Sequence, residues 1–181
     1  MGMQDRFTRE ETCLIILGID PGIAIVGFGV IRMQGSLLKP VQYGTIRTDA
    51  GLRTEARLKQ IYDALKQIIH TYKPDVMAVE KLFFNRNVTT AFTVGQARGV
   101  ILLAAEEARL ELAEYTPLQV KQAVVGYGQA EKQQVQEMVR MLLHLKEKPK
   151  PDDVADALAI AICHGHSNQI NSLLKEKGFP R

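Results

Sequence analysis

Two apolar segments that each end in a carboxylate constrain this chain more than any other feature. Residues 14–19 read LIILGI and are followed by Asp20, and residues 76–79 read VMAV and are followed by Glu80. A short run that is apolar on both faces predicts a strand in the middle of a covered sheet. An acid at the carboxyl end of such a strand faces the edge where open α/β sheets bind ligands.

A third segment carries two more acids. Asp153 and Asp156 are three residues apart in a helix predicted over residues 152–166, so they share one helix face. Asp153 has an ordinary explanation, because acids favour the amino terminus of a helix. Asp156 lies within the apolar sequence VADALAIAI, where an unpaired charge is costly. Asp156 therefore needs a partner, and a metal ion would be one.

Each acid alone also has a structural explanation. Asp20 precedes Pro-Gly and could form a turn with its own backbone, and Glu80 could mark the exit of its strand into solvent. The joint pattern is more specific, since three separate elements each deliver acids at one of their ends. Oxygen ligands suit Mg²⁺ or Mn²⁺, and two such ions can cleave a phosphodiester. Clustered carboxylates repel one another, so we expect Mg²⁺ to stabilise the protein.

The order of predicted elements gives the fold class. We expect strands over residues 14–20, 26–33, 41–48, 76–80 and 112–115, and helices over residues 52–72, 89–109, 117–125, 131–145 and 152–166. Three strands joined by short turns predict an antiparallel meander. The later alternation of helix and strand predicts an α/β fold with a mixed five-stranded sheet flanked by helices.

Composition narrows the setting. The 181 residues, 46% hydrophobic and 24% charged, fit one globular domain, expected over residues 14–167. Residues 1–13 are expected to be a flexible leader and residues 168–181 a polar tail. The chain has two cysteines and no CxxC pair, and its first twelve residues lack an apolar signal-peptide core. We therefore expect a cytoplasmic protein without a membrane segment.

Aromatic residues next to the acids are candidates for contact with nucleic acid. Phe83 and Phe84 follow Glu80 closely. They either fill the core, which is the usual fate of phenylalanine, or stack on a base. Arg86 lies between two asparagines and favours the second interpretation, as a partner for phosphate.

Basic residues form a second candidate surface. Lys121 and Lys132 flank a glycine-containing loop over residues 126–128. From Lys121 to Lys150 there are six Lys or Arg and three Asp or Glu residues, a local excess of three positive charges. This excess suits contact with phosphates, although a solvated helix face explains it equally well. The net charge of +3 permits nucleic-acid binding without indicating it.

Taken together, these residues resemble a known family, the RuvC crossover junction endodeoxyribonucleases, which are bacterial Holliday junction resolvases. The similarity runs from about residue 14 to residue 166. Its most specific parts are residues 18–22 (GIDPG), 79–80 (VE) with the phenylalanines that follow, 95–99 (GQARG), 119–122 (QVKQ) and 153–161 (DVADALAIA). Five blocks in the matching order make chance agreement remote.

The resemblance implies an RNase H-like three-layer fold and a Mg²⁺-dependent endonuclease. This class of enzyme makes paired symmetric nicks in four-way DNA junctions and leaves 5′-phosphate and 3′-hydroxyl ends. It implies two Mg²⁺ ions per subunit, for which Mn²⁺ would substitute. The implied catalytic acids and metal ligands are Asp20, Glu80, Asp153 and Asp156. Some family members carry a histidine where this chain has Asp153.

The resemblance also implies how DNA is held. Lys121 and Lys132 match basic residues near the scissile phosphate and are expected to take part in catalysis. Phe83 matches the aromatic residue that packs against opened base pairs, and Phe84 matches an aromatic residue in some members. The implied partners are four-way junction DNA and the RuvA–RuvB branch-migration complex.

A homodimer is expected because a two-fold junction needs two nicks, which a C2 dimer supplies from two sites. Small residues lie along one side of the helix predicted over residues 89–109, namely Ala91, Gly95, Gly99 and Ala104. This side is a candidate for part of the dimer interface. It would equally suit packing against the sheet.

Three other functions remain open at this point. A nucleotide-binding protein of the actin and sugar-kinase type also has an Ile-Asp-x-Gly loop after a strand, but it needs a second phosphate loop and a second domain. A DNA-structure binder without enzymatic activity would use the acids structurally. An RNA-processing nuclease of the same fold would lack a reason for Phe83 and Phe84.

Overall fold

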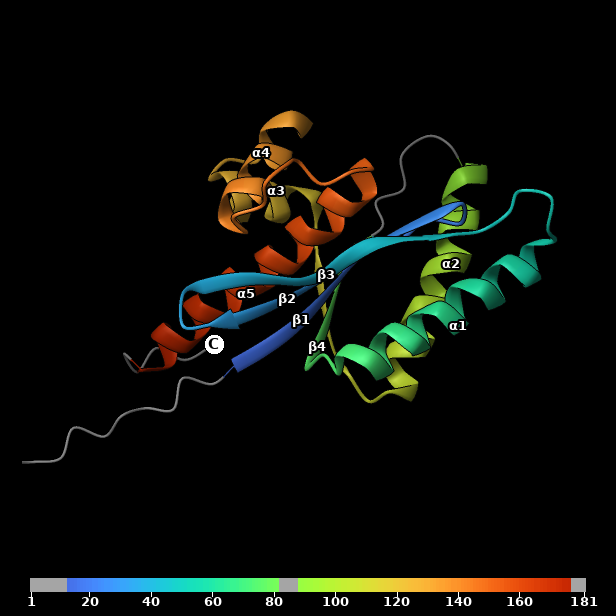
Figure 1. The fold of residues 1–181 in the computed structure, drawn as a ribbon, viewed down its shortest axis with the longest axis horizontal. Helices are drawn as coiled ribbons and strands as arrows, with labels where there is room; N and C mark the ends of the chain where they lie inside the picture. The colour runs from blue at the N-terminus through green and yellow to red at the C-terminus, as the bar shows by residue number, and fades with distance from the viewer. Residues whose placement is uncertain (1–12, 82–87, 177–181) are drawn as a thin grey trace, which may run out of the picture.

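A five-stranded mixed sheet forms the centre of the computed structural model, which describes residues 13–81 and 88–176 (Figure 1). The strand order is β3-β2-β1-β4-β5. The strands are β1 (Cys13–Asp20), β2 (Ile25–Gln34), β3 (Leu37–Arg47), β4 (Val76–Glu80) and β5 (Glu111–Tyr115). β1, β2 and β3 pair antiparallel, whereas β1, β4 and β5 pair in parallel. The predicted mixed sheet and its antiparallel meander are confirmed.

The β2–β3 hairpin shows why one strand boundary was predicted wrongly. Gly35 takes a positive φ of 57° in the two-residue turn, a conformation that glycine adopts without strain. β3 then begins at Leu37, four residues before the predicted start, and it includes Pro40. The ladder shifts register between Val30 and Ile31, opposite this proline. Because β3 is an edge strand, it tolerates a proline at such an irregularity.

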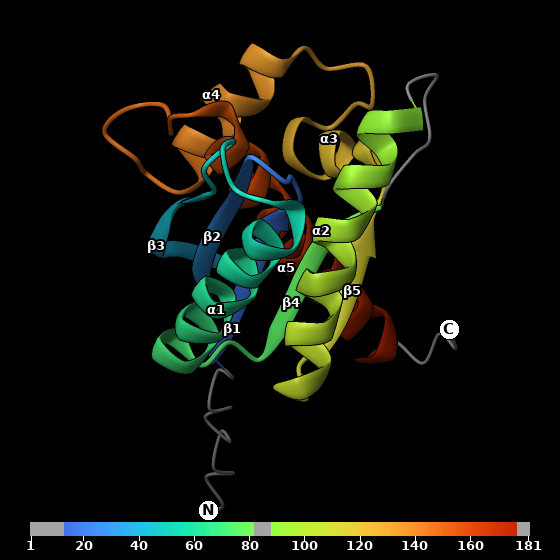
Figure 2. The same ribbon diagram turned by 90° about the vertical axis from the view of Figure 1, so that its right-hand side faces the viewer.

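Helices cover both faces of the sheet, so the molecule has three layers (Figures 1 and 2). The helices are α1 (Thr54–Tyr72), α2 (Val88–Glu107), α3 (Pro117–Val125), α4 (Lys132–Leu142) and α5 (Asp152–Glu176). One apolar core lies between the sheet and the pair α1 and α2. A second core lies on the other face, where α5 crosses the sheet and α3 and α4 pack against α5. None of the helices in the described ranges is long and apolar enough to cross a membrane.

Three helices end at positions other than the predicted ones, and α2 differs least, since it ends at Glu107 instead of residue 109. α5 continues ten residues past His166 to Glu176, because no glycine or proline interrupts the chain before Gly178. The predicted helix end at residue 166 is therefore wrong, and the assignment of residues 168–181 as a polar tail stays a prediction. α4 ends at Leu142 instead of residue 145, and His144 then takes a positive φ of 52°.

Glycines in the central strands let α5 lie directly on the sheet. A methyl group built on Gly18 would lie 2.1 Å from the carbonyl oxygen of Ala157, and one on Gly29 would lie 2.6 Å from a methyl carbon of Leu158. Gly18 and Gly29 face each other in the β1–β2 ladder. The backbone of α5 thus replaces side chains that would otherwise fill this space, and its position along β1 is fixed.

Candidate active site

The alternation of side chains along β1 and β4 places one acid from each strand on the α5 side of the sheet. Ile16 and Ala78 belong to the core under α5, so Asp20 and Glu80, which follow at even spacing, share their faces. β1 and β4 are parallel neighbours. Their carboxyl ends therefore meet at one edge, and both acids lie there.

α5 brings the other two acids to the same edge. Its first turn begins above Gly27, which is the partner of Asp20 in the β1–β2 ladder. Asp153 lies in that first turn, and Asp156 follows one turn later on the same face. The four predicted acids, which are far apart in the sequence, thus come together where β1 and β4 end and α5 begins.

The electrostatics of Asp20 show how closely these acids interact. The pKa of its carboxyl is raised from the ordinary 3.8 to about 8, first by burial and then by the charges of Asp156, Glu80 and Asp153. The positive charge of Lys132 acts in the opposite sense. The ionisation of Asp20 is therefore coupled to the charges of all three other acids.

The pKa values of Glu80 and Asp156 are raised for the same physical reasons. Burial raises the pKa of Glu80, and the charge of Asp156 adds to the effect. Burial also raises the pKa of Asp156, which the ion pair with Lys132 partly offsets. All three shifts have the sign expected for carboxylates that are crowded together and only partly neutralised.

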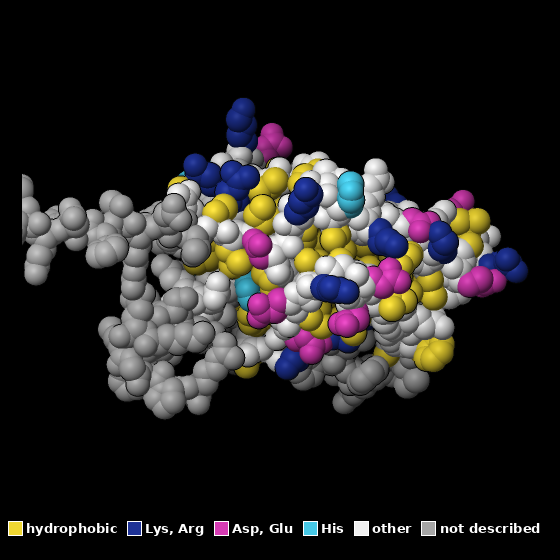
Figure 3. All heavy atoms as spheres, turned by 90° about the horizontal axis from the view of Figure 1, so that it is seen from below, with side chains coloured by type: hydrophobic (Ala, Val, Ile, Leu, Met, Phe, Trp, Pro, Cys, Tyr) yellow, Lys and Arg dark blue, Asp and Glu magenta, His cyan; other side chains and the backbone are white. Residues whose placement is uncertain are grey.

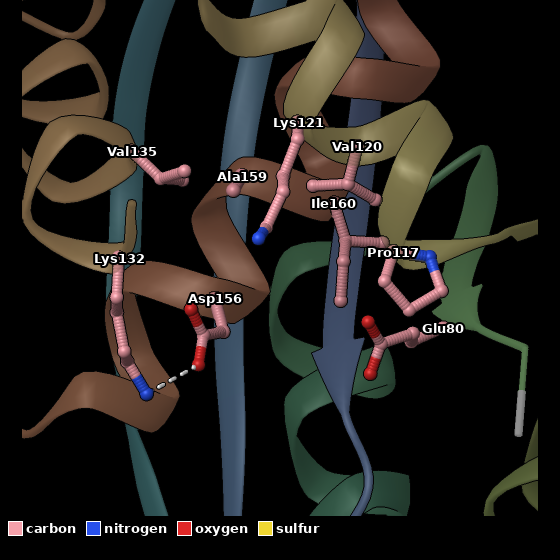
Figure 4. A pocket seen from close by; sticks show the side chains of 9 residues that line it. All are labelled: Glu80, Pro117, Val120, Lys121, Lys132, Val135, Asp156, Ala159 and Ile160. Carbon is pink, nitrogen blue, oxygen red and sulfur yellow. Dashed lines mark ion pairs between the residues drawn. The ribbon is translucent and has the colours of Figure 1, made fainter. Parts of the chain in front are cut away.

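A cavity of about 240 Å³ opens beside these acids (Figure 4). Glu80 and Asp156 line one side, and Lys121 and Lys132 contribute positive charge. Its remaining lining residues are apolar or proline: Pro117, Val120, Val135, Ala159 and Ile160. Lys132 reaches Asp156, with 3.1 Å between Nζ and Oδ2. Lys121 points from α3 into the cavity, and among the described residues it has no ion-pair partner.

Helix capping fixes the positions of both lysines. The hydroxyl of Thr116 accepts a hydrogen bond from the Gln119 amide at 3.1 Å, and the Gln119 side chain accepts one from the Thr116 amide at 2.8 Å. This capping box starts α3, which carries Lys121. At the start of α4, the Gln134 side chain accepts a hydrogen bond from the Glu131 amide at 2.8 Å. Lys132 is thus the first residue of a well-defined helix.

Lys132 has a second acidic partner that the sequence did not single out as functional. Its Nζ lies 3.2 Å from Oδ2 of Asp152, the first residue of α5. Burial lowers the pKa of Lys132, but the hydrogen bonds and charges of Asp156 and Asp152 raise it by more. The sequence signal that could have identified Asp152 as a partner of Lys132 is its four-residue spacing from Asp156, which places both acids on one helix face.

The donor set suits a hard divalent cation. Asp20, Glu80, Asp153 and Asp156 offer only carboxylate oxygens, the ligands that Mg²⁺ and Mn²⁺ prefer. The raised pKa values indicate a negative cluster that a cation would relieve. Within the described part of the chain, no three Asp, Glu, His or Cys side chains already form a closed coordination site.

Three predicted DNA-contact residues cannot be placed. Phe83, Phe84 and Arg86 lie outside the described residues, so their roles stay predictions.

The face at the opposite end of the sheet, where β1 and β4 begin, shows acidic and basic side chains interspersed with hydrophobic ones (Figure 3). The grouped acids of the candidate site lie at the other end, together with Lys121 and Lys132.

Fold and site together define a class of protein. A mixed five-stranded sheet between helical layers, with acids at the ends of the first and fourth strands and at the start of the last helix, is the arrangement of an RNase H-like nuclease. The comparisons with known proteins make this class more specific. The family model for "Crossover junction endodeoxyribonuclease RuvC" matches residues 16–164.

Relatives and solved structures agree with that match. The crossover junction endodeoxyribonuclease RuvC of Brevibacillus brevis is 70% identical over 149 residues, which is 82% of this chain and 90% of the relative. That of Alkaliphilus metalliredigens is 57% identical and covers 91% of this chain and 100% of the relative. The structure "T. thermophilus RuvC in complex with Holliday junction substrate" has a TM-score of 0.84 at 38% identity, over 88% of this chain and 97% of that one.

This chain belongs to the RuvC family of crossover junction endodeoxyribonucleases. The family assignment, the fold and the hydrolase activity predicted from the sequence are confirmed. The yeast mitochondrial Holliday junction resolvase Ydc2 shares the fold alone, with a TM-score of 0.63 at 14% identity over 89% of this chain and 83% of that one.

Proposed function

We propose that this protein resolves four-way DNA junctions by hydrolysing two symmetrically placed phosphodiesters with the help of two Mg²⁺ ions per subunit. Mn²⁺ would substitute for Mg²⁺. The metal ligands and catalytic acids are Asp20, Glu80, Asp153 and Asp156. One observation carries this proposal: acids from the ends of β1 and β4 and from the start of α5 come together beside a cavity, and the pKa of Asp20 is raised to about 8 by burial and by the three other acids. Such a cluster is stable in its ionised form only when cations neutralise it.

Asp20 is the central ligand in this proposal because its ionisation is coupled to all three other acids. Asp156 and Glu80 line the cavity and face the substrate side, whereas Asp153 lies at the very start of α5. When bound, the metal ions act as Lewis acids toward the phosphate oxygens and lower the pKa of the attacking water. Hydrolysis leaves a 5′-phosphate and a 3′-hydroxyl, ends that a ligase rejoins.

The two lysines have different tasks. Lys121 points into the cavity and has no ion-pair partner among the described residues, so its charge is available for a DNA phosphate. Positive charge placed there stabilises the charge that develops on the phosphate oxygens in the transition state. Lys132 pairs with Asp156 in the metal-free protein, and its charge becomes available to the phosphate backbone when a metal ion takes that carboxylate. Phe83, Phe84 and Arg86 complete the DNA contacts next to Glu80.

The dimer uses α2 as part of its interface. Phe92 and Leu103 expose 67% and 52% of their surface, and helical spacing places them on the same side of α2 as Gly95 and Gly99. Side chains built on Gly95 and Gly99 would meet nothing within 4 Å, so this side of α2 is unpacked in the single subunit. Ala104, which the sequence placed on the same side, is buried and does not belong to it. These four residues, Phe92, Gly95, Gly99 and Leu103, form an exposed stripe on α2. A two-fold dimer through this stripe would supply two active sites for a two-fold junction.

Two further assignments rest on family membership. We propose that the enzyme works in the cytoplasm, where recombination intermediates are formed and repaired. Its partner there is the RuvA–RuvB branch-migration complex, which would deliver junctions to it. Co-purification of this protein with RuvA and RuvB on a four-way junction, compared with each component alone, tests this assignment.

Replacing one carboxylate tests the catalytic proposal. Asp20→Asn keeps the shape of the side chain but removes the charge that the other acids sense, so cleavage of a four-way junction should fall by roughly 10³-fold or more. Junction binding, measured in EDTA by gel shift, should stay the same or tighten. The control is Asp63→Asn, an exposed acid on α1 whose partner is Lys59. Cleavage by Asp20→Asn at the wild-type rate would refute the proposal.

A further inference from the structure

The starts of α4 and α5 meet through four polar side chains. Lys132 and Gln136 lie four residues apart on one face of α4, and Asp152 and Asp156 lie four residues apart on one face of α5. Nζ of Lys132 lies 3.2 Å from Oδ2 of Asp152 and 3.1 Å from Oδ2 of Asp156. Nε2 of Gln136 donates a hydrogen bond of 2.8 Å to Oδ1 of Asp152. Both oxygens of Asp152 are therefore held by α4.

The two acids that share Lys132 differ in their relation to the cavity. Asp156 lines the cavity together with Lys132, whereas Asp152 and Gln136 are not part of its lining. Asp152 is also more exposed, with 60% of its side chain accessible compared with 36% for Asp156. The ammonium group of Lys132 thus bridges an acid inside the cavity and an acid outside it.

A divalent cation at Asp156 would compete with Lys132 for the same carboxylate. A lysine ammonium is a point charge on a flexible stem, so losing one partner leaves it free to move away unless a second partner holds it. Asp152 is such a partner, and Gln136 fixes the carboxylate of Asp152 in turn. Lys132 would then remain beside the cavity with its charge directed at an incoming phosphate.

We propose that Asp152 is a positioning residue, which holds Lys132 at the edge of the cavity when Asp156 binds a metal ion. This inference rests on the proposed function of the same site. Asp152 acts through Lys132 and is not itself a metal ligand.

The ordinary explanation for Asp152 is that an acid stabilises the amino terminus of a helix. Asp153 lies in the same first turn and meets that requirement as well. A favourable interaction with the helix dipole depends on neither Lys132 nor Gln136. The two explanations therefore differ in one measurable respect: only a positioning role makes the effect of Asp152 depend on Lys132.

A double-mutant cycle measures this dependence. The variants are Asp152→Asn, Asp152→Ala, Lys132→Ala and Asp152→Ala combined with Lys132→Ala. Asp152→Asn keeps an acceptor for Gln136 and removes only the charge. We expect both Asp152 substitutions to lower the single-turnover cleavage rate at saturating junction and Mg²⁺ by roughly 3- to 10-fold. The dissociation constant for the junction in EDTA should change less than about twofold, because the effect is on the cleavage step.

Adding Asp152→Ala to Lys132→Ala should change the rate less than about twofold, because the residue that Asp152 positions is then missing. Asp152→Glu should recover part of the rate. An unchanged rate for Asp152→Asn would overturn the inference, as would the same loss in both backgrounds. Asp63→Asn, an exposed acid that pairs with Lys59 at 2.6 Å, controls for loss of surface charge and should leave the rate unchanged. Absence of any cleavage by the wild-type protein would instead count against the proposed function.

A structural measurement covers the case in which Lys132→Ala is too slow to measure. Crystals of the wild-type protein and of Asp152→Asn would be grown with Ca²⁺, which occupies carboxylate sites without supporting cleavage in many nucleases. We expect Nζ of Lys132 to stay in hydrogen-bond contact with Asp152 in the wild type and to leave that position in the variant. The same lysine position in both crystals would overturn the inference.

Discussion

The carbonyl oxygen of Asp153 lies directly over Gly27, so that a methyl group on Gly27 would be only 1.9 Å from it. Gly27 is also the partner of Asp20 in the β1–β2 ladder. The missing side chain therefore lets the start of α5 come down beside the end of β1. This contact brings the acids of α5 to the acids of the strands.

Gly27→Ala should damage both the fold and the site. The new methyl group cannot be accommodated unless α5 moves, so the free energy of unfolding should fall by about 3 kcal/mol or more. Cleavage should be lost with it, because Asp153 and Asp156 shift away from Asp20. Urea denaturation followed by circular dichroism measures the stability. Gly51→Ala is the control, since its nearest non-neighbouring atom would be 3.5 Å away, and equal stability of the two variants would contradict the account.

The raised pKa of Asp20 predicts how the stability of the metal-free protein changes with pH. The folded state holds the Asp20 proton up to a pKa of about 8, whereas the ordinary value is 3.8. Between these values the folded state binds more protons than the unfolded state, so stability falls as pH rises. We expect the Tm of wild type minus that of Asp20→Asn to decrease from pH 5 to pH 9 in EDTA.

Bound Mg²⁺ should reverse this fall in stability with rising pH. A bound cation favours the ionised carboxylates, so the stabilisation by a fixed Mg²⁺ concentration should grow between pH 6 and pH 9. Differential scanning calorimetry of the wild type with Mg²⁺ and with EDTA gives the two curves. A Tm difference between wild type and Asp20→Asn that is constant with pH, or no response to Mg²⁺, would show that the acids are not coupled as described.

The exposed stripe on α2 predicts the effect of a charge on oligomeric state. Leu103→Glu should convert the proposed dimer to a monomer at micromolar protein, because a carboxylate would be buried in an apolar contact. Met141→Glu is a closely matched control, since Met141 on α4 is 53% exposed and Leu103 is 52% exposed. Gel filtration with light scattering distinguishes the two forms. A dimer that tolerates Leu103→Glu would place the interface elsewhere, and a wild-type monomer would remove the dimer proposal.

Local signals in the sequence predicted much of the fold. The bounds of α3 follow from Thr116 and Pro117 at its start and from Gly126, which takes a φ of 95° at its end. The apolar runs before Asp20 and Glu80 correctly predicted β1 and β4, and both strands end at these acids. These elements are well predicted because their boundaries depend on residues close in sequence.

Features that depend on distant contacts were predicted less well. The pairing of Lys132 with Asp152 requires α4 to lie beside α5, and no local pattern records that placement. Ala104 was assigned to the wrong side of α2 because the helix is apolar all round, so its periodicity does not separate the core from the exposed stripe. The start of β3 was predicted four residues too late, since the sequence does not show that β3 is an edge strand, which tolerates Pro40.

Cleavage of a synthetic mobile four-way junction tests the central claim most directly. The protein would be incubated with the junction, and with a linear duplex of the same sequence, in Mg²⁺ and in EDTA, and the cuts on each labelled strand would be mapped. We predict paired nicks at symmetric positions in the junction, only with Mg²⁺, and an uncut duplex. Junction binding without cuts in either Mg²⁺ or Mn²⁺ would contradict a catalytic role for the acids, and equal cutting of the duplex would contradict selectivity for junctions.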